Sequence, residues 1–201
     1  HFALDTRSTT SDGGLRSTWP PAKVHLFGAL STGMELKQPL PIADAEREYP
    51  SSCQYLSLVP EEPYVHVDAE KPFWWDLPVW IAHGKIDSIG LCNNHMQRDG
   101  MLDNEAWGKP RDRLSFPAPH GNGLWSQAIY YKLLDCGLRI PPSAGSASGV
   151  LPNPVGYNRV YVHCGESLTY DAWWENLKAG QVSNQGLAFL GGQFILVINI
   201  S

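Results

Sequence analysis

The chain has 201 residues, 43% of them hydrophobic and 17% charged, a composition typical of one globular domain. Its 15 Lys and Arg against 20 Asp and Glu give a formal charge of −5, and no basic patch interleaved with aromatic residues occurs, so nucleic acid is not expected as a partner. The longest apolar stretch, residues 187–200, contains two glycines and is shorter than the ~20 residues that a membrane-spanning helix needs, so no membrane segment is expected.

The first 60 residues carry weak structural signals. Residues 1–22 are rich in Ser, Thr, Gly and Pro and lack a hydrophobic period, which predicts an irregular N-terminal arm. Residues 23–30 fit a short strand, and residues 40–59 fit a loop followed by a weakly patterned helical or extended piece. The chain opens with His1 rather than Met, and no signal segment follows, which indicates a processed protein or a fragment. No motif identifies the compartment or the oligomeric state.

The stretch at 64–70 alternates apolar and polar side chains and predicts a strand. Period two sends Val65 and Val67 to one face and His66, Asp68 and Glu70 to the other. Three side chains of metal-ligand type would then share a face.

Helices and strands alternate in the rest of the chain. A helix is expected at 76–83, with Asp76 as its cap and Gly84 as its stop, followed by a strand at 86–92 that ends in Asn-Asn-His. Residues 96–125 form a long polar loop that could cover a pocket. Further helices are expected at 126–136, capped by Ser126, and at 169–179, capped by Ser167 or Thr169. With strands at 138–140 and 158–163, the alternation predicts an α/β fold whose four strands are neighbours in one largely parallel sheet.

Three stretches resemble the later part of one known family. They are "EKPFWWDLPVWIAHGKIDSIGLCNNHM" (70–96), "CGLRIPPSAGSASGVLPNPVGYNRVYVH" (136–163) and "LTYDAWWENLKAGQV" (168–182). They look like CehA/McbA-like metallohydrolases of the PHP (polymerase and histidinol phosphatase) superfamily, over about residues 39–181. The resemblance implies a partial or distorted (β/α)7 barrel with a metal cluster at the carboxyl ends of its strands. It divides the chain into an arm at 1–22, a partial PHP-like domain at 23–181 and an atypical C-terminal segment at 182–201.

The sequence also departs from the pattern of that family. It contains no His-x-His and no Asp-His pair, which open PHP barrels, and Ala147 and Gly149 stand where the family has a metal-binding Asp and His. These departures point to an incomplete or degenerate site.

The resemblance makes His66 the counterpart of a metal-binding His. Glu70 and His95 are the other candidate metal ligands, and Asp68 and His95 are the candidate catalytic groups. Imidazole and carboxylate suit zinc, manganese or iron, and such a cation would polarise a phosphoryl or carbonyl oxygen and activate a bound water. The alternative is structural: His66 and Asp68 hydrogen-bond within the strand end, and Glu70 pairs with Lys71.

The remaining candidates are weaker. His120 lies on a flexible loop, whereas His25, His83 and His163 lack a second ligand at useful spacing. "PSAGSASG" fits a tight turn better than a phosphate cradle, because it lacks the Gly-Lys-Ser/Thr ending of a P-loop. The Trp pairs at 74–75 and 173–174 fit core packing better than ring stacking on a ligand. The four Cys have no Cys-x-x-Cys spacing and are expected to be free, buried or half-buried thiols.

The sequence and the resemblance predict two alternative functions. The first is a PHP-like metal-dependent hydrolase of phosphoester or related ester bonds, incomplete or degenerate in this chain, with a small molecule as substrate. The second is a catalytically inactive PHP-like module that binds a small ligand or a partner.

Overall fold

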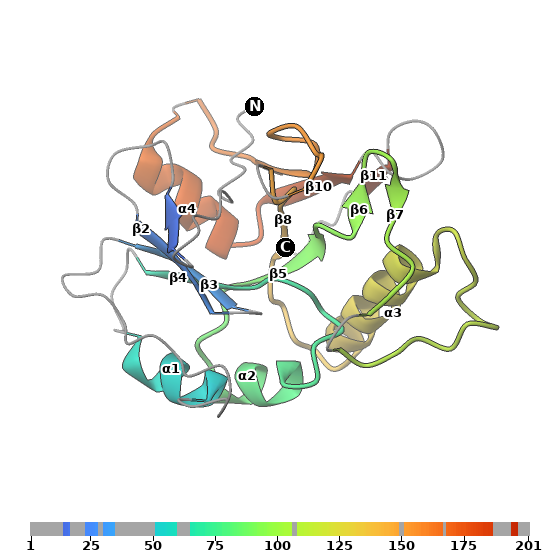
Figure 1. Ribbon diagram of the computed structural model, residues 1–201. Coiled ribbons are helices and arrows are strands. Elements are labelled where there is room, and N and C mark those ends of the chain that lie inside the picture. Colours follow the sequence, from blue (N-terminus) through green and yellow to red (C-terminus); the bar gives the residue numbers. More distant parts are fainter. Residues whose placement is uncertain are drawn as a thin grey trace.

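A mixed six-stranded sheet forms the centre of the protein in its computed structural model (Figure 1). The structure describes residues 51–59, 65–105, 108–148, 151–166 and 168–186, together with the backbone of short strands at 14–16, 23–27, 30–34 and 194–196. The sheet has the order β1-β2-β3-β4-β5-β8. Its strands are β1 (Gly14–Arg16), β2 (Lys23–Phe27), β3 (Leu30–Met34), β4 (His66–Ala69), β5 (Ser88–Cys92) and β8 (Pro142–Ala144).

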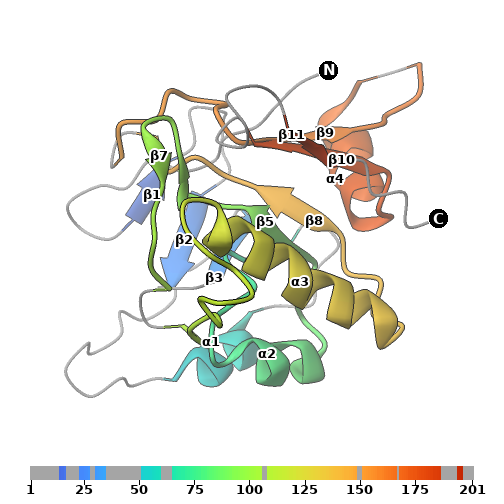
Figure 2. The same ribbon diagram turned by 90° about the vertical axis from the view of Figure 1, so that its right-hand side faces the viewer.

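Two smaller β structures accompany this sheet. One is a three-stranded sheet of β9 (Arg159–Val162), β10 (Val182–Gly186) and β11 (Phe194–Leu196), and the other is a hairpin of β6 (Met96–Gln97) and β7 (Gly100–Met101). The helices are α1 (Ser52–Leu58), α2 (Leu77–His83), α3 (Gly121–Asp135) and α4 (Tyr170–Lys178). Figure 2 shows β9, β10 and β11 beside α4, with β5 and β8 between them and the α1–α2 pair.

The protein is an α/β fold, but its strands are not mostly parallel. β4, β5 and β8 run parallel to one another, whereas every other described strand pair is antiparallel. β2 and β3 are only two residues apart in sequence, and so short a connection permits antiparallel pairing alone. The described strands do not close into a barrel.

Helix ends follow the sequence signals in two of the three predicted helices. Gly84 ends α2 with a φ of 82°, a left-handed conformation that favours glycine, and Thr169 caps α4 by accepting a hydrogen bond from the Ala172 N–H at 3.1 Å. Asp76 occupies the N-cap position of α2 but makes no capping hydrogen bond; its carboxylate accepts from the Ser52 hydroxyl at 3.1 Å.

Several predicted boundaries were wrong. α3 begins at Gly121, so the predicted cap Ser126 lies fully buried inside it, and the third parallel strand lies at 142–144 rather than 138–140. The strand predicted at 158–163 belongs to the second sheet, where it pairs antiparallel with β10. The predicted irregular arm includes β1, and the rest of residues 1–22 lies outside the described part of the chain.

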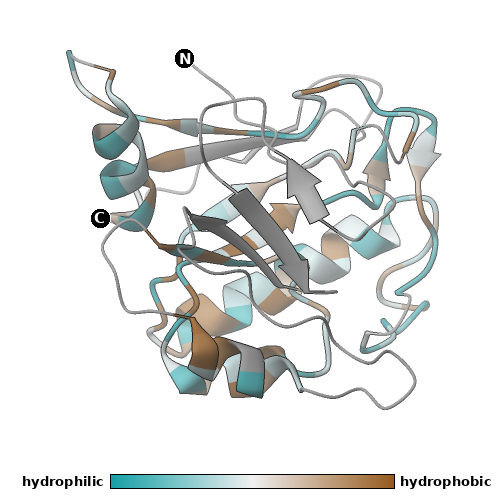
Figure 3. Cartoon of the chain, turned by 60° about the vertical axis from the view of Figure 1, so that its left-hand side comes forward, coloured by the Kyte–Doolittle hydropathy of each residue, from teal (hydrophilic) through white to brown (hydrophobic). Residues whose placement is uncertain are grey.

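The two faces of the parallel strands have different chemistry. Val67, Ala69, Ile89 and Leu91 face the main core with residues of α1, α2 and α3, while α4 packs with β9 and β10 in a second cluster. Hydrophobic and hydrophilic residues are interspersed along the helices (Figure 3), and α4 buries one face through Trp173 and Leu177, which are four residues apart. The opposite face of β4 and β5 carries the polar residues at 66, 68 and 88.

Gly90 in the middle of β5 is required by close backbone packing. A Cβ at this position would collide with the carbonyl oxygen of Glu70, which is main chain and cannot turn away. We expect Gly90→Ala to lower the free energy of unfolding by about 1–3 kcal/mol because the strands must separate. Urea denaturation measures this, with the exposed Val79→Ala on α2 as a control; equal stability of the two variants would contradict the prediction.

Candidate functional site

The predicted site residues fall into two clusters. In the first, His66 Nε2 lies 2.8 Å from the Ser88 hydroxyl oxygen, and that hydroxyl donates to Asp68 Oδ1 at 2.5 Å. Ser143 from β8 donates a hydrogen bond to the same carboxylate oxygen. All four side chains are buried. We call these four residues the His66 network.

The hydrogen bonds fix the protonation of His66. The Ser88 hydroxyl has one proton, which it gives to Asp68, so it accepts from His66 and the imidazole proton lies on Nε2. Nδ1 then carries a lone pair. This buried atom has no hydrogen-bond partner, and the ring packs against Trp174 at 4.7 Å between centroids.

Although it contains Ser, His and Asp, the network is not arranged as a catalytic triad. A triad needs the imidazole to accept the serine proton and to donate its other N–H to the carboxylate. Here the serine gives its proton to Asp68 directly, and Ser88 is fully buried. The arrangement therefore provides no activated nucleophile.

The second cluster contains Glu70, Lys71 and His95. Lys71 Nζ lies 3.3 Å from Glu70 Oε2 and 5.0 Å from the centroid of the Trp74 ring. His95 Nδ1 lies 3.0 Å from the Asn104 carbonyl oxygen, an acceptor, so the imidazole proton lies on Nδ1 and the lone pair on Nε2. Anchoring one ring nitrogen in this way is common among metal-binding histidines.

The two clusters adjoin along β4, where Asp68 and Glu70 are two residues apart, but their histidines lie toward opposite ends of the parallel strands. Asp68 pairs with Ser88 at the amino end of β5, and Cys92 ends that strand four residues later, about 13 Å away at ~3.3 Å per residue. His95 follows beyond Cys92 and contacts Phe73, which follows β4, at 5.3 Å between ring centroids. The structure thus brings together His66 with Asp68 and Glu70 with His95. It does not bring His66 to His95, as a shared cation would require.

Both contacts of the structural alternative are present. His66 and Asp68 are joined through Ser88, and Glu70 pairs with Lys71. Within the described part of the chain, no group of three or more His, Cys, Asp or Glu side chains is placed to hold a metal ion.

Burial depresses the pKa of both histidines. Desolvation, followed by the charge of Lys178, lowers the pKa of His66 to about 3. Desolvation, followed by the charge of Lys71, lowers the pKa of His95 to about 4, while the Asn104 carbonyl and Glu70 act in the opposite direction. Both imidazoles are therefore neutral at pH 7.

Acid should destabilise the fold through these two groups. Each histidine takes up a proton near pH 6.5 when unfolded but only near pH 3 or 4 when folded, so the unfolded chain binds more protons between those values. Stability then falls as pH falls, by about 2 kcal/mol per histidine between pH 7 and pH 5. Urea denaturation across this range measures the slope. His66→Gln should remove the contribution of His66 to the slope and leave that of His95; an unchanged slope in His66→Gln would refute the assignment.

The other predicted candidates lie outside the four-residue His66 network. His83 Nε2 lies 3.2 Å from the Ser57 hydroxyl, His120 precedes α3, and His163 is exposed, whereas the side chain of His25 lies outside the described residues. In the "PSAGSASG" segment, Pro142–Ala144 form strand β8 rather than a turn, and the chain turns after it, where Ala147 has a φ of 49° and Ser146 accepts a hydrogen bond from the Asn158 N–H at 2.8 Å.

The aromatic and cysteine predictions hold only in part. Trp173 is buried and Trp74 and Trp174 are half-buried, but Trp75 is 62% exposed, which core packing does not explain. All four Cys are free; Cys136 is exposed rather than buried or half-buried.

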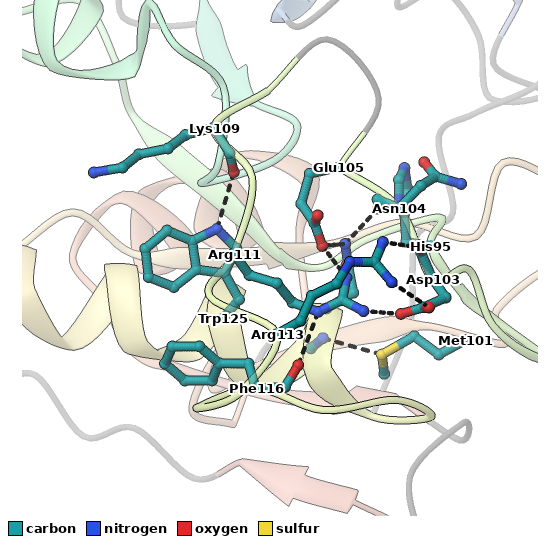
Figure 4. Close-up of polar contacts among 12 residues, drawn as sticks. His95, Met101, Asp103, Asn104, Glu105, Lys109, Arg111, Arg113, Phe116 and Trp125 are labelled. Atoms are coloured by element: carbon teal, nitrogen blue, oxygen red, sulfur yellow. Dashed lines mark hydrogen bonds and ion pairs between the residues drawn. The ribbon is translucent and has the colours of Figure 1, made fainter.

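A buried ionic network holds the predicted loop at 96–125. Arg111, whose side chain is completely buried, pairs with Asp103 and Glu105 and donates to the Phe116 carbonyl at 2.9 Å (Figure 4). Asn122 of α3 donates to the Asn104 carbonyl at 2.7 Å, the same oxygen that His95 contacts. The loop therefore fixes the orientation of the His95 ring.

Sequence reasoning missed three residues around His66. Ser88 is the polar residue in an otherwise apolar strand, a signal that was available; Ser143 lies in the flagged turn segment, and only the fold brings it to Asp68. Trp174 was assigned to the core, but its contact with His66 depends on how α4 docks.

No family model, no curated protein and no solved structure matches this chain. Among the described helices, none is both long enough and apolar enough to cross a membrane.

Proposed function

We propose that this chain is a catalytically inactive PHP-like α/β module that binds a small ligand. The separation of the two histidines carries this proposal: a hydrolytic metal centre needs three or more convergent ligands, and His66 begins β4 whereas His95 lies beyond the carboxyl end of β5. Asp68, a candidate catalytic group, is also engaged, because its Oδ1 accepts hydrogen bonds from Ser88 and Ser143.

A second candidate is the metal-dependent hydrolase in incomplete or degenerate form. The Glu70–His95 cluster favours it, because it follows the carboxyl ends of parallel strands, where sites of α/β proteins collect. His95 has its lone pair on Nε2 and Glu70 supplies a carboxylate, which together suit zinc, manganese or iron.

Elemental analysis separates the two candidates. Protein purified with added zinc or manganese should hold less than about 0.1 equivalent of metal and should not hydrolyse p-nitrophenyl phosphate if the module is inactive. One equivalent of metal that is lost in His95→Gln but kept in His66→Gln, together with hydrolysis that follows the metal, would instead establish the hydrolase.

A further inference from the structure

Helices α1 and α2 are almost free of charged residues. Residues 51–59 contain none and residues 72–84 contain one, Asp76, in a chain that is 17% charged. The two helices lie together at one end of the molecule, away from α4 and the second sheet (Figures 1 and 2). A surface that is poor in charge and exposes aromatic residues is typical of the centre of a protein–protein interface.

Contacts near both ends hold α1 and α2 side by side. The Ser52 hydroxyl at the start of α1 accepts from Trp80 Nε1 at 2.8 Å, and the Ser57 hydroxyl near its end lies 3.2 Å from His83 Nε2. The two helices therefore run in the same direction and present one surface. Their inner side belongs to the main core, so their outer side is what they offer to a partner.

The outer side of α2 is apolar. Four exposed residues follow the spacing i, i+3, i+4 and i+7, which places side chains along one face of a helix, and Asp76 has helical dihedral angles that extend this spacing to the residue before it. Trp75 is 62% exposed and Val79 is 55% exposed, and Leu58 at the end of α1 is 50% exposed. We call the following four residues the α2 face: Trp75, Pro78, Val79 and Ala82.

The two ends of the α2 face carry opposite charges. Asp76 is exposed at the amino end of α2, and Lys85 follows its carboxyl end. Lys85 Nζ donates to the Val59 carbonyl at 2.7 Å, which holds the ammonium group at this end of the helix pair. A face with one acidic and one basic end complements a second copy of itself when the two copies run antiparallel, because each acidic end then meets a basic end.

We infer that the α2 face is a two-fold interface between two copies of this chain, with their α2 helices packed antiparallel. Val79 lies near the two-fold axis, and Trp75 packs against Ala82 of the partner subunit, a large side chain beside a small one. At each end, Asp76 pairs with Lys85 of the partner subunit. The inference is independent of the ligand and metal proposals, because α1 and α2 pack on the face of β4 and β5 opposite His66.

Sedimentation equilibrium of the whole chain measures the association. A single helix pair makes a small interface, so we expect dimers with a Kd on the order of 100 µM and monomers at the lower concentrations used for urea denaturation. Val79→Glu should weaken the association roughly tenfold or more, because it places two carboxylates near the axis. Val155→Glu is the matched control, since Val155 is 76% exposed but lies between β8 and β9, and it should leave the Kd unchanged.

An exchange of charges tests the antiparallel orientation. Asp76→Lys and Lys85→Glu should each weaken self-association roughly tenfold, because each variant has the same charge at both ends of the α2 face. An equimolar mixture of the two variants should associate about as tightly as the wild-type chain, since opposite charges then meet at both ends. Circular dichroism of each variant alone shows that it is folded.

Each outcome decides the inference. A chain that stays monomeric up to about 1 mM overturns it and leaves the α2 face to a different protein. Dimers that persist in Val79→Glu overturn it as well, because they form through another surface. If the two charge variants associated alone as tightly as they do in the mixture, the antiparallel pairing of α2 would be wrong.

Discussion

Replacing Arg111 with methionine is expected to lower the free energy of unfolding by about 3–5 kcal/mol. The substitution leaves the Glu105 carboxylate, whose side chain is 5% exposed, buried without its cation, and it also removes the pairing with Asp103. The Phe116 carbonyl loses its donor as well. Urea denaturation at constant pH gives the change directly.

Arg113→Met is the matched control. Arg113 also contacts Asp103, at 2.9 Å, but its side chain is 63% exposed, so its loss should cost no more than about 1 kcal/mol. The wild-type and Arg113→Met proteins should keep the Asn104 contact that orients His95, whereas Arg111→Met should shift the His95 imidazole resonance. Similar stabilities for the two variants would show that the Arg111 network does not hold the loop.

Replacing Asn158 with aspartate is expected to cost at least about 3 kcal/mol, although the two side chains have nearly the same shape. Asn158 is fully buried, and its Nδ2 lies within 2.9–3.3 Å of three backbone carbonyl oxygens, those of Asn93, Met96 and Gly145. An aspartate would place a carboxylate oxygen against these acceptors, so it must either repel them or remain protonated. Thermal and urea denaturation measure the loss.

Asn176→Asp tests whether this cost comes from the environment of Asn158. Asn176 donates to one carbonyl, that of Ala172 at 2.7 Å, from a half-buried position on α4. We expect a loss of about 1 kcal/mol there. If Asn158→Asp lowered the free energy of unfolding by no more than Asn176→Asp does, the three carbonyl contacts would not be what holds the end of β5 to the segment before β9.

Local signals in the sequence determined several elements of this protein. Gly84 and Thr169 mark helix ends because φ preference and side-chain capping depend on neighbouring residues alone. The alternation at 64–70 likewise placed Val67 in the core and His66 with Asp68 on the opposite face, since strand period is a property of the backbone.

Only the tertiary structure decided which residues meet. The sequence placed His66 and His95 at one rim, but the register of β4 against β5 sets them toward opposite ends of the strands. The turn that brings Ser143 to Asp68, the docking of α4 that sets Trp174 on His66, and the antiparallel return of β10 along β9 all depend on contacts between distant segments. Period and propensity describe one segment at a time, so they fix the face on which a side chain lies but not its neighbour across the fold.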